Sequence, residues 1–264
     1  MPGPLHCLPS RNKTPSATLS WSVSSADPLY PIANAATLES DVVAKAQATT
    51  ATLRATFGGA QALEGVIAIN TNWPGLTVPL TNNGGMVSQG RVVPSPEDDL
   101  QVNVFWDLRE VASASAAQWE IAVSGAPGNV TIGTLILVES WEALKIKWGY
   151  GIRETHPVIT KVTSHKKKLR YRIPVRYRAF TGTPFWAEDR ALMRTLRRET
   201  HGPFTPFGFV PDEEDLEAFL VQFSEKDAEE TYEFVSGRFD DTTEQGNVPM
   251  PIELEEVSGG VSLL

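Results

Sequence analysis

The sequence predicts a mostly β protein, in which an N-terminal β-sandwich jelly roll precedes an α+β domain with an antiparallel sheet and one main helix. Three observations support this prediction. Short apolar runs with period-two alternation fill the first half, each bounded by Gly, Pro, Asn or Ser. One stretch after residue 183 has helical character, and the charge changes abruptly near residue 144. At 264 residues and 41% apolar content, the chain can fill two cores.

Residues 1–16 are expected to form an extended arm, because they carry four prolines. His6 and Cys7 stand side by side in this arm. Two neighbouring ligands are too few for a metal centre, so we assign no metal and no cofactor. Cys7 is the single cysteine, which excludes an internal disulfide.

Residues 17–142 carry the predicted jelly roll. The region from Gln118 to Gly151 is the organising stretch, since the sandwich ends there and a chemically different segment begins. Within it, Trp119–Val123 and Val130–Val138 are expected to form a hairpin around the turn Ser124–Asn129. The other predicted strands are Leu19–Val23, Thr52–Phe57, Gly65–Ile69 and Val102–Trp106.

Residues 143–264 form the predicted C-terminal domain. The stretch His165–Phe180 alternates apolar and basic residues, which predicts one strand with a cationic face, and Pro174 places it at a sheet edge. A helix is expected over Pro184–Arg198, with acidic residues early and arginines late. Further strands are expected over Phe207–Val210, Ala218–Phe223 and Thr231–Phe239, followed by an extended acidic tail after Gln245.

The net charge of −9 is divided unevenly: −6 over residues 1–144, +12 over 145–198 and −15 over 199–264. Two explanations remain open. The basic block of one copy contacts the acidic block of the next, which closes a ring, or the blocks neutralise each other within one subunit. The interface residues predicted by the first explanation are Arg170, Arg172, Arg176 and Arg178 against Asp212, Glu213, Glu214 and Asp215.

Nucleic acid is another possible partner of the basic block. Its composition is typical of a nucleic-acid-binding surface, since Lys166–Lys168 and four arginines are interleaved with Tyr171 and Tyr177. These tyrosines share the apolar face, which favours a core role over base stacking. We therefore favour a protein partner. No stretch approaches the eighteen or so apolar residues of a membrane span. The N-terminus lacks a secretory signal, so synthesis in a cytoplasm is expected.

Catalytic motifs are not found in the sequence: it contains no nucleophile elbow, phosphate loop, zinc motif or EF-hand. The carboxylate clusters Glu97–Asp99 and Asp212–Asp215 are interpreted as solvated turns rather than calcium sites. The four histidines are expected in loops or at element ends. We predict that the protein is not an enzyme. A pair of carboxylates brought together by the fold is the remaining enzymatic alternative.

Two parts of the chain resemble a known class of proteins. Tyr30–Asn34, Ala51–Asn72 and Ser124–Trp141 resemble the discoidin-type, galactose-binding-like jelly rolls in tail proteins of tailed bacteriophages. Residues Ala33–Ala51 depart from that pattern, which often has an Asp-Gly turn and a Thr-x-Trp signal. The second half is similar to the C-terminal domain of the same class at Tyr171–Tyr177, Pro184–Arg198, Pro203–Pro211 and Asp212–Asp215.

The resemblance implies a virion structural protein of a phage tail tip, made in the host cytoplasm. As a distal tail or baseplate adaptor, it would assemble as a ring or trimer that joins the tail tube to the hub, tip or fibres. The alternative is a carbohydrate-binding module that recognises a host-surface glycan. Asn72 and Trp73, in the predicted loop Asn72–Gly75, are the candidate glycan-binding residues.

Overall fold

The computed structural model describes residues 4–22, 27–38, 42–83, 85–94, 102–111, 114–143, 151–155, 158–162, 168–172, 177–182, 187–211, 218–224 and 252–257. The elements of the first half are β1 (Leu5–His6), η1 (Pro9–Arg11), η2 (Thr14–Ser16), β2 (Thr18–Trp21), η3 (Ile32–Ala36), β3 (Ala44–Lys45), β4 (Thr50–Ala62), β5 (Gly65–Thr71), β6 (Pro79–Asn82), β7 (Gly85–Gln89), β8 (Arg91–Pro94), β9 (Val102–Asp107), β10 (Ser115–Ser124), β11 (Thr131–Ile132), β12 (Thr134–Val138) and β13 (Glu142–Ala143). Those of the second half are β14 (Gly151–Thr155), β15 (Val158–Val162), β16 (Lys168–Arg172), β17 (Tyr177–Gly182), α1 (Ala187–Thr200), η4 (Gly202–Phe204), β18 (Phe207–Val210), β19 (Phe219–Phe223) and β20 (Ile252–Glu256).

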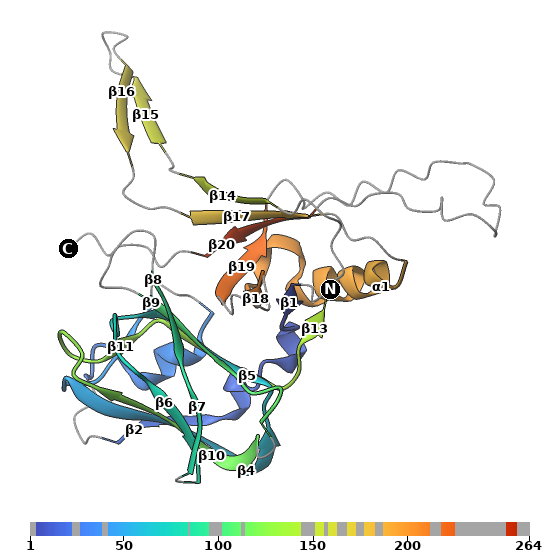
Figure 1. The fold of residues 1–264 in the computed structure, drawn as a ribbon. Coiled ribbons are helices and arrows are strands. Elements are labelled where there is room, and N and C mark those ends of the chain that lie inside the picture. Colours follow the sequence, from blue (N-terminus) through green and yellow to red (C-terminus); the bar gives the residue numbers. More distant parts are fainter. Residues whose placement is uncertain are drawn as a thin grey trace.

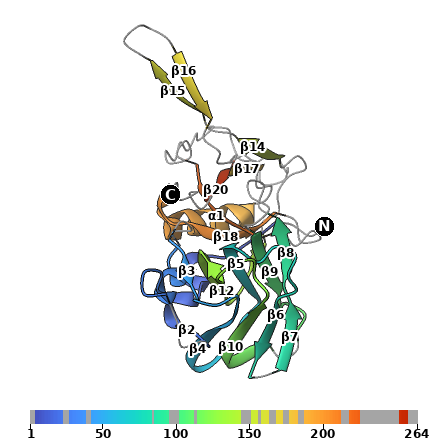
Figure 2. The ribbon, with the colours of Figure 1, turned by 90° about the vertical axis from the view of Figure 1, so that its left-hand side faces the viewer.

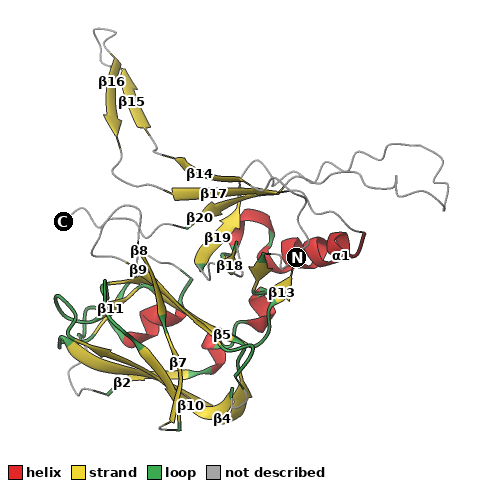
Figure 3. Cartoon of the chain, viewed as in Figure 1, coloured by secondary structure: helices red, strands yellow, loops and turns green. Residues whose placement is uncertain are grey.

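The predicted fold class is confirmed: the chain is mostly β, with antiparallel sheets and one main helix (Figure 3). Two sheets form the jelly-roll sandwich. The outer sheet has the order β2-β4-β10-β6-β7, and the middle sheet has the order β12-β5-β9-β8. Strand β4 alternates buried and exposed residues from Thr50 to Phe57, because one face meets the core and the other meets solvent.

The core between the outer and middle sheets is aromatic. Trp73, Trp106 and Trp119 are fully buried in it, and the Trp106 Nε1 donates to the Val78 carbonyl at 2.9 Å. These side chains bury large apolar areas, so they contribute strongly to the stability of the sandwich.

The expected hairpin over Trp119–Val138 is not formed. Strand β10 pairs with β4 and β6 in the outer sheet, whereas β12 pairs with β5 in the middle sheet. The turn at Ser124–Asn129 therefore carries the chain from one sheet to the other. Apolar alternation identified the strands correctly, but it does not say which strands pair.

A large sheet of seven strands combines strands of both halves, with the order β13-β1-β18-β19-β20-β17-β14 (Figure 1). Strand β1 comes from the N-terminal arm and lies between β13 and β18. Strand β20 comes from the acidic tail and lies between β19 and β17. The N-terminal arm and the C-terminal tail, which were both expected to be extended segments outside the domains, thus each supply an interior strand of this sheet.

The large sheet packs on the outward face of the middle sheet. Ile67 and Ile136 of the middle sheet lie in one buried cluster with Leu5, Val210 and Leu220 of the large sheet. The two sheets approach closely at Gly208, where an added Cβ would lie 2.9 Å from the Ile67 Cδ1. The middle sheet is thus covered on both faces, which explains why all five residues of β12 are buried.

Helix α1 covers the other face of the large sheet. Its Met193 and Leu196 pack with Phe207, Phe209 and other apolar residues of β18 and β19. The helix agrees with the prediction over Pro184–Arg198, although the described part begins at Ala187. The fold is therefore a stack of outer sheet, middle sheet, large sheet and helix (Figures 1 and 2).

The basic stretch His165–Phe180 contributes two strands rather than the single strand expected. Among the described strands, β16 pairs only with β15, in a separate two-stranded sheet, and β17 joins the large sheet between β14 and β20. Pro174, which was expected to place the strand at a sheet edge, lies outside the described residues. The strand predicted over Thr231–Phe239 lies outside the described residues.

Candidate functional site

The basic hairpin, which we define as β15 and β16, projects from the stack of layers (Figures 1 and 2). Its register places Arg170 opposite Thr160 and Arg172 opposite Val158. The three basic residues of β16, Lys168, Arg170 and Arg172, occupy alternate positions of its sequence. The hairpin pairs with no other strand in the described part of the chain.

The remaining predicted interface residues are placed differently or not at all. Arg178 lies on β17, within the large sheet, and its register partner on β14 is Glu154. Arg176, and the acidic residues Asp212, Glu213, Glu214 and Asp215, lie outside the described residues. The structure therefore brings together Arg170 and Arg172 on the basic hairpin and leaves their pairing with an acidic partner as a prediction.

The large sheet interleaves the basic and acidic blocks of the sequence. Acidic β20 pairs with basic-block β17, so that Glu255 and Glu253 lie opposite Ala179 and Thr181. The same β17 carries Arg178 opposite Glu154. The two blocks thus meet in this sheet through the pairing of the β17 and β20 backbones, whereas the basic hairpin stays apart from it in the described part of the chain.

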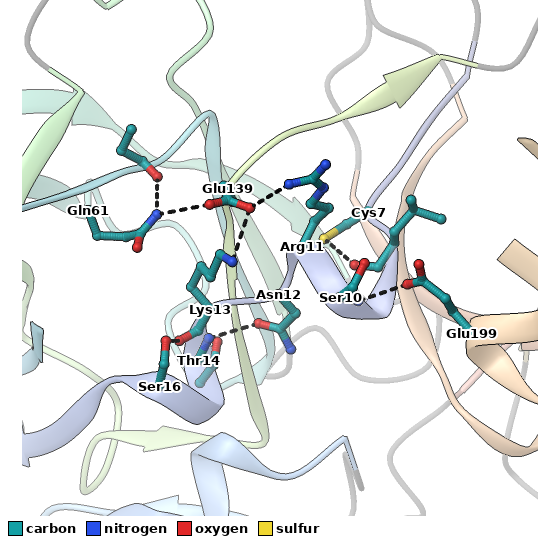
Figure 4. Close-up of polar contacts among 12 residues, drawn as sticks. Cys7, Ser10, Arg11, Asn12, Lys13, Thr14, Ser16, Gln61, Glu139 and Glu199 are labelled. Atoms are coloured by element: carbon teal, nitrogen blue, oxygen red, sulfur yellow. Dashed lines mark hydrogen bonds and ion pairs between the residues drawn. The ribbon is translucent and has the colours of Figure 1, made fainter. Parts of the chain in front are cut away.

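The N-terminal arm connects the sandwich, the large sheet and α1. Its backbone binds β12 and the residue after it: the Lys13 amide donates to the Leu137 carbonyl at 2.7 Å, and the Glu139 amide donates to the Arg11 carbonyl at 2.9 Å. At its other side, the Ser10 amide donates to the Glu199 Oε2 of α1 at 2.9 Å. Figure 4 shows the Ser10–Glu199 contact beside the side-chain contacts of the arm.

Glu139 is the centre of the polar contacts of the arm. Its Oε2 lies 3.0 Å from both the Lys13 Nζ and the Arg11 Nη1, and the Gln61 amide reaches its Oε1 at 3.4 Å (Figure 4). The hydrogen bonds from Lys13 and Arg11 lower the pKa of Glu139 below its ordinary value of 4.5. The carboxylate is therefore held in its charged form.

Replacing the Glu139 carboxylate tests how much these ion pairs with the N-terminal arm stabilise the fold. Glu139→Gln is expected to lower the free energy of unfolding at pH 7 by less than about 1 kcal/mol, the range of partly exposed ion pairs. Since the folded-state pKa is lowered, the stabilisation is complete above the ordinary Glu pKa and is lost as the pH falls through the lowered value. Urea unfolding at pH 7 and pH 3.5 measures this difference. A wild-type advantage that grows toward pH 3.5 would contradict it.

The candidate glycan residues, Asn72 and Trp73, do not present an exposed aromatic face. Trp73 is fully buried in the sandwich core. Both polar atoms of the Asn72 side chain are used within the chain: Oδ1 accepts from the Thr131 amide and Nδ2 donates to the Asn129 carbonyl, each at 2.8 Å. Asn72 thus fastens the end of β5 to the loop before β11, and Trp73 anchors this loop in the core.

The described residues offer few groups for catalysis or metal binding. Among them, no three His, Cys, Asp or Glu side chains are arranged to hold a metal ion. Burial raises the pKa of the Cys7 thiol to about 12, so this thiol is a poor nucleophile. None of the helices in the described part of the chain has the length and apolar character needed to span a membrane.

Comparisons with known proteins find distant structural similarity. The chain matches no protein-family model and no curated protein sequence. It is similar to the family 32 carbohydrate-binding module of Clostridium perfringens NanJ in complex with galactose, at 16% identity and a TM-score of 0.37, over 52% of this chain and 99% of that one. It is also similar to the fucose-binding module SpX-3 of Streptococcus pneumoniae, at 14% identity and a TM-score of 0.36, over 47% and 96%. A third similar structure is reduced XRCC1 bound to the DNA polymerase β catalytic domain, at 11% identity and a TM-score of 0.36, over 46% and 93%.

Proposed function

We propose that this protein is a non-catalytic assembly protein of a phage tail tip, which docks onto an acidic surface of a neighbouring protein through its basic hairpin. The observation that carries the proposal is the position of the hairpin: β15 and β16 pair only with each other among the described strands, and they project from the body (Figures 1 and 2). The tail-tip setting comes from the resemblance of the sequence.

The composition of the basic hairpin supports a docking role. It carries four basic residues in its two strands, namely Lys161, Lys168, Arg170 and Arg172. An isolated two-stranded hairpin is marginally stable in water, so contact with a partner would contribute to its order. Complementary charge would also set the orientation of the contact and accelerate encounter. The acidic segment 212–215 of a second copy is the partner that we favour, in a contact that closes a ring.

Charge reversal on the basic hairpin tests this function. The mass of the protein is measured by light scattering at about 50 mM and 500 mM salt, for the wild type and for Arg170→Glu/Arg172→Glu. We expect an oligomer that dissociates at high salt, because screening weakens such contacts, and a monomer for the double variant. Lys45→Glu/Arg54→Glu, on the sandwich, reverses the same charge and should leave the oligomer intact. A wild-type monomer at both salt concentrations would contradict self-assembly.

Carbohydrate binding is the second candidate, and Tyr30 favours it. This tyrosine is partly exposed before η3 in the sandwich, and the Lys45 Nζ lies 5.4 Å from the centre of its ring. An aromatic ring beside a polar group is a combination that small-molecule sites use. A glycan array probed with the wild type and with Tyr30→Ala tests it. Binding that depends on Tyr30, by a protein that stays monomeric, would replace the assembly function with this one.

A further inference from the structure

The N-terminal strand is held in an unusual position for so short a segment. Strand β1 is two residues long, yet it lies inside the large sheet, where Leu5 pairs with Ala143 of β13 and with Val210 of β18. The next amide, that of Cys7, donates to the Gly208 carbonyl at 2.9 Å. When this segment leaves, β18 keeps its pairing with β19, whereas β13 loses its pairing with β1.

His6 is the polar residue of this strand, and it is completely buried. Its exposed fraction is 0%, and neither Nδ1 nor Nε2 has a hydrogen-bond partner among the described residues. A buried polar group without a partner is costly. Leu5 and Cys7 face the middle sheet, so His6 lies on the opposite face of β1, where its register partner Phe209 packs under α1.

Charged groups are present on the elements around β1, yet none compensates His6. Strand β13 places Glu142 opposite His6, η1 carries Arg11, and α1 carries Arg197 and Glu199. Strand β18 contains no titratable residue. Burial alone lowers the pKa of His6 from 6.5 to about 4, with no contribution from any of these charges. A protonated His6 would thus be a buried cation without a counter-ion.

We propose that Pro4–Leu8 is an acid-released strap, which stays in the large sheet while His6 is neutral and leaves it when His6 takes up a proton. The released state lets the imidazolium reach water. It also uncovers the edge of β18 and the apolar surfaces that Leu5 and Leu8 cover. The uncovered edge has the unpaired backbone groups to which an extended segment of a partner binds.

The sign of the effect follows from the lowered pKa. Between pH 6.5 and about 4, the released strap binds a proton that the docked strap does not. Release is therefore favoured as the pH falls through this range, and it is independent of pH above it. A pKa of about 4 in the docked state implies that the ratio of released to docked strap rises roughly thirty-fold between pH 7.5 and pH 5.

Hydrogen–deuterium exchange of the full chain tests the strap. Exchange of the Leu5–Leu8 amides is measured at pH 7.5 and pH 5, corrected for the intrinsic effect of pH. We expect the roughly thirty-fold rise in the wild type and a nearly constant value in His6→Leu. The matched control is His201→Asn, at an exposed histidine with φ 53°, a backbone conformation that Asn tolerates. This control should keep the full rise.

Three outcomes would overturn the proposal. The first is an equal rise in the wild type and in His6→Leu. The second is an equal rise in β5 of the middle sheet, which would indicate global unfolding instead of release of the strap. The third is observable in the wild type alone, should His6→Leu fail to fold: an NMR titration in which the His6 imidazole has an ordinary pKa.

Discussion

Removal of residues 1–8 is expected to lower the free energy of unfolding by on the order of 5 kcal/mol, the largest effect that we predict for a change in the arm. The deletion takes away the apolar side chains of Leu5, Cys7 and Leu8, which are 3%, 1% and 6% exposed. A fully buried Leu contributes about 1.5–3 kcal/mol, and the lost strand also leaves β18 with an open edge. Since small domains are stable by about 5–15 kcal/mol, the truncated chain should be close to unfolding.

Chemical denaturation and light scattering measure this loss, together with the aggregation that an open edge promotes. The comparison is Leu29→Ala, which removes an apolar side chain that is 81% exposed and should change little. A truncated chain with the wild-type midpoint of unfolding would show that the arm is an accessory to the large sheet. Such a result would also remove the basis of the strap.

Trp73→Ala is expected to cost about 3–5 kcal/mol, the usual range for deleting a buried aromatic side chain. The indole is 0% exposed and packs in the sandwich core, so its removal leaves a cavity. Trp73→Phe is the matched comparison: the indole Nε1 has no hydrogen-bond partner in the part of the chain that the structure describes, so phenylalanine loses only volume and should cost markedly less.

Urea unfolding of the three proteins tests the assignment of Trp73 to the core. A glycan-binding role predicts the reverse order, in which Trp73→Ala is nearly as stable as the wild type and loses only binding. A cost below about 0.5 kcal/mol, the range of ordinary surface substitutions, would therefore contradict the buried position.

Period-two alternation predicted the strands well, because it reports which faces are buried. Thr52–Phe57 was placed correctly on this basis, as part of β4, whereas Gly65–Ile69 is a correctly placed part of β5 that is buried throughout and does not alternate. Alternation says nothing of partners, and the chain from β10 to β12 changes sheet where a hairpin was expected. The sequence did contain a signal that the middle sheet is covered on its second face as well. The continuous apolar run Leu135–Val138 is typical of a strand buried on both faces.

The functional residues were harder to predict, because their placement depends on contacts between distant segments. Trp73 stands in a Pro-Gly loop, which favours exposure, yet the fold turns its ring into the core. His6 was interpreted as a loop residue, since nothing nearby in sequence indicates that β13 and β18 enclose it. Pairing of β1 with strands about 135 and 200 residues away cannot be read from a local pattern.

The doubly covered middle sheet has a consequence for how this protein can be divided. The sequence predicts a domain boundary near residue 142. The apolar cluster that contains Ile67, Phe105 and Ile136 of the first half, however, also contains residues of the second half, which shield these side chains from water. A fragment cut at that boundary would expose this surface to water and lose strand β13. We therefore expect the two halves to be stable only when they are expressed together, since a jelly roll on its own would need polar residues at these positions.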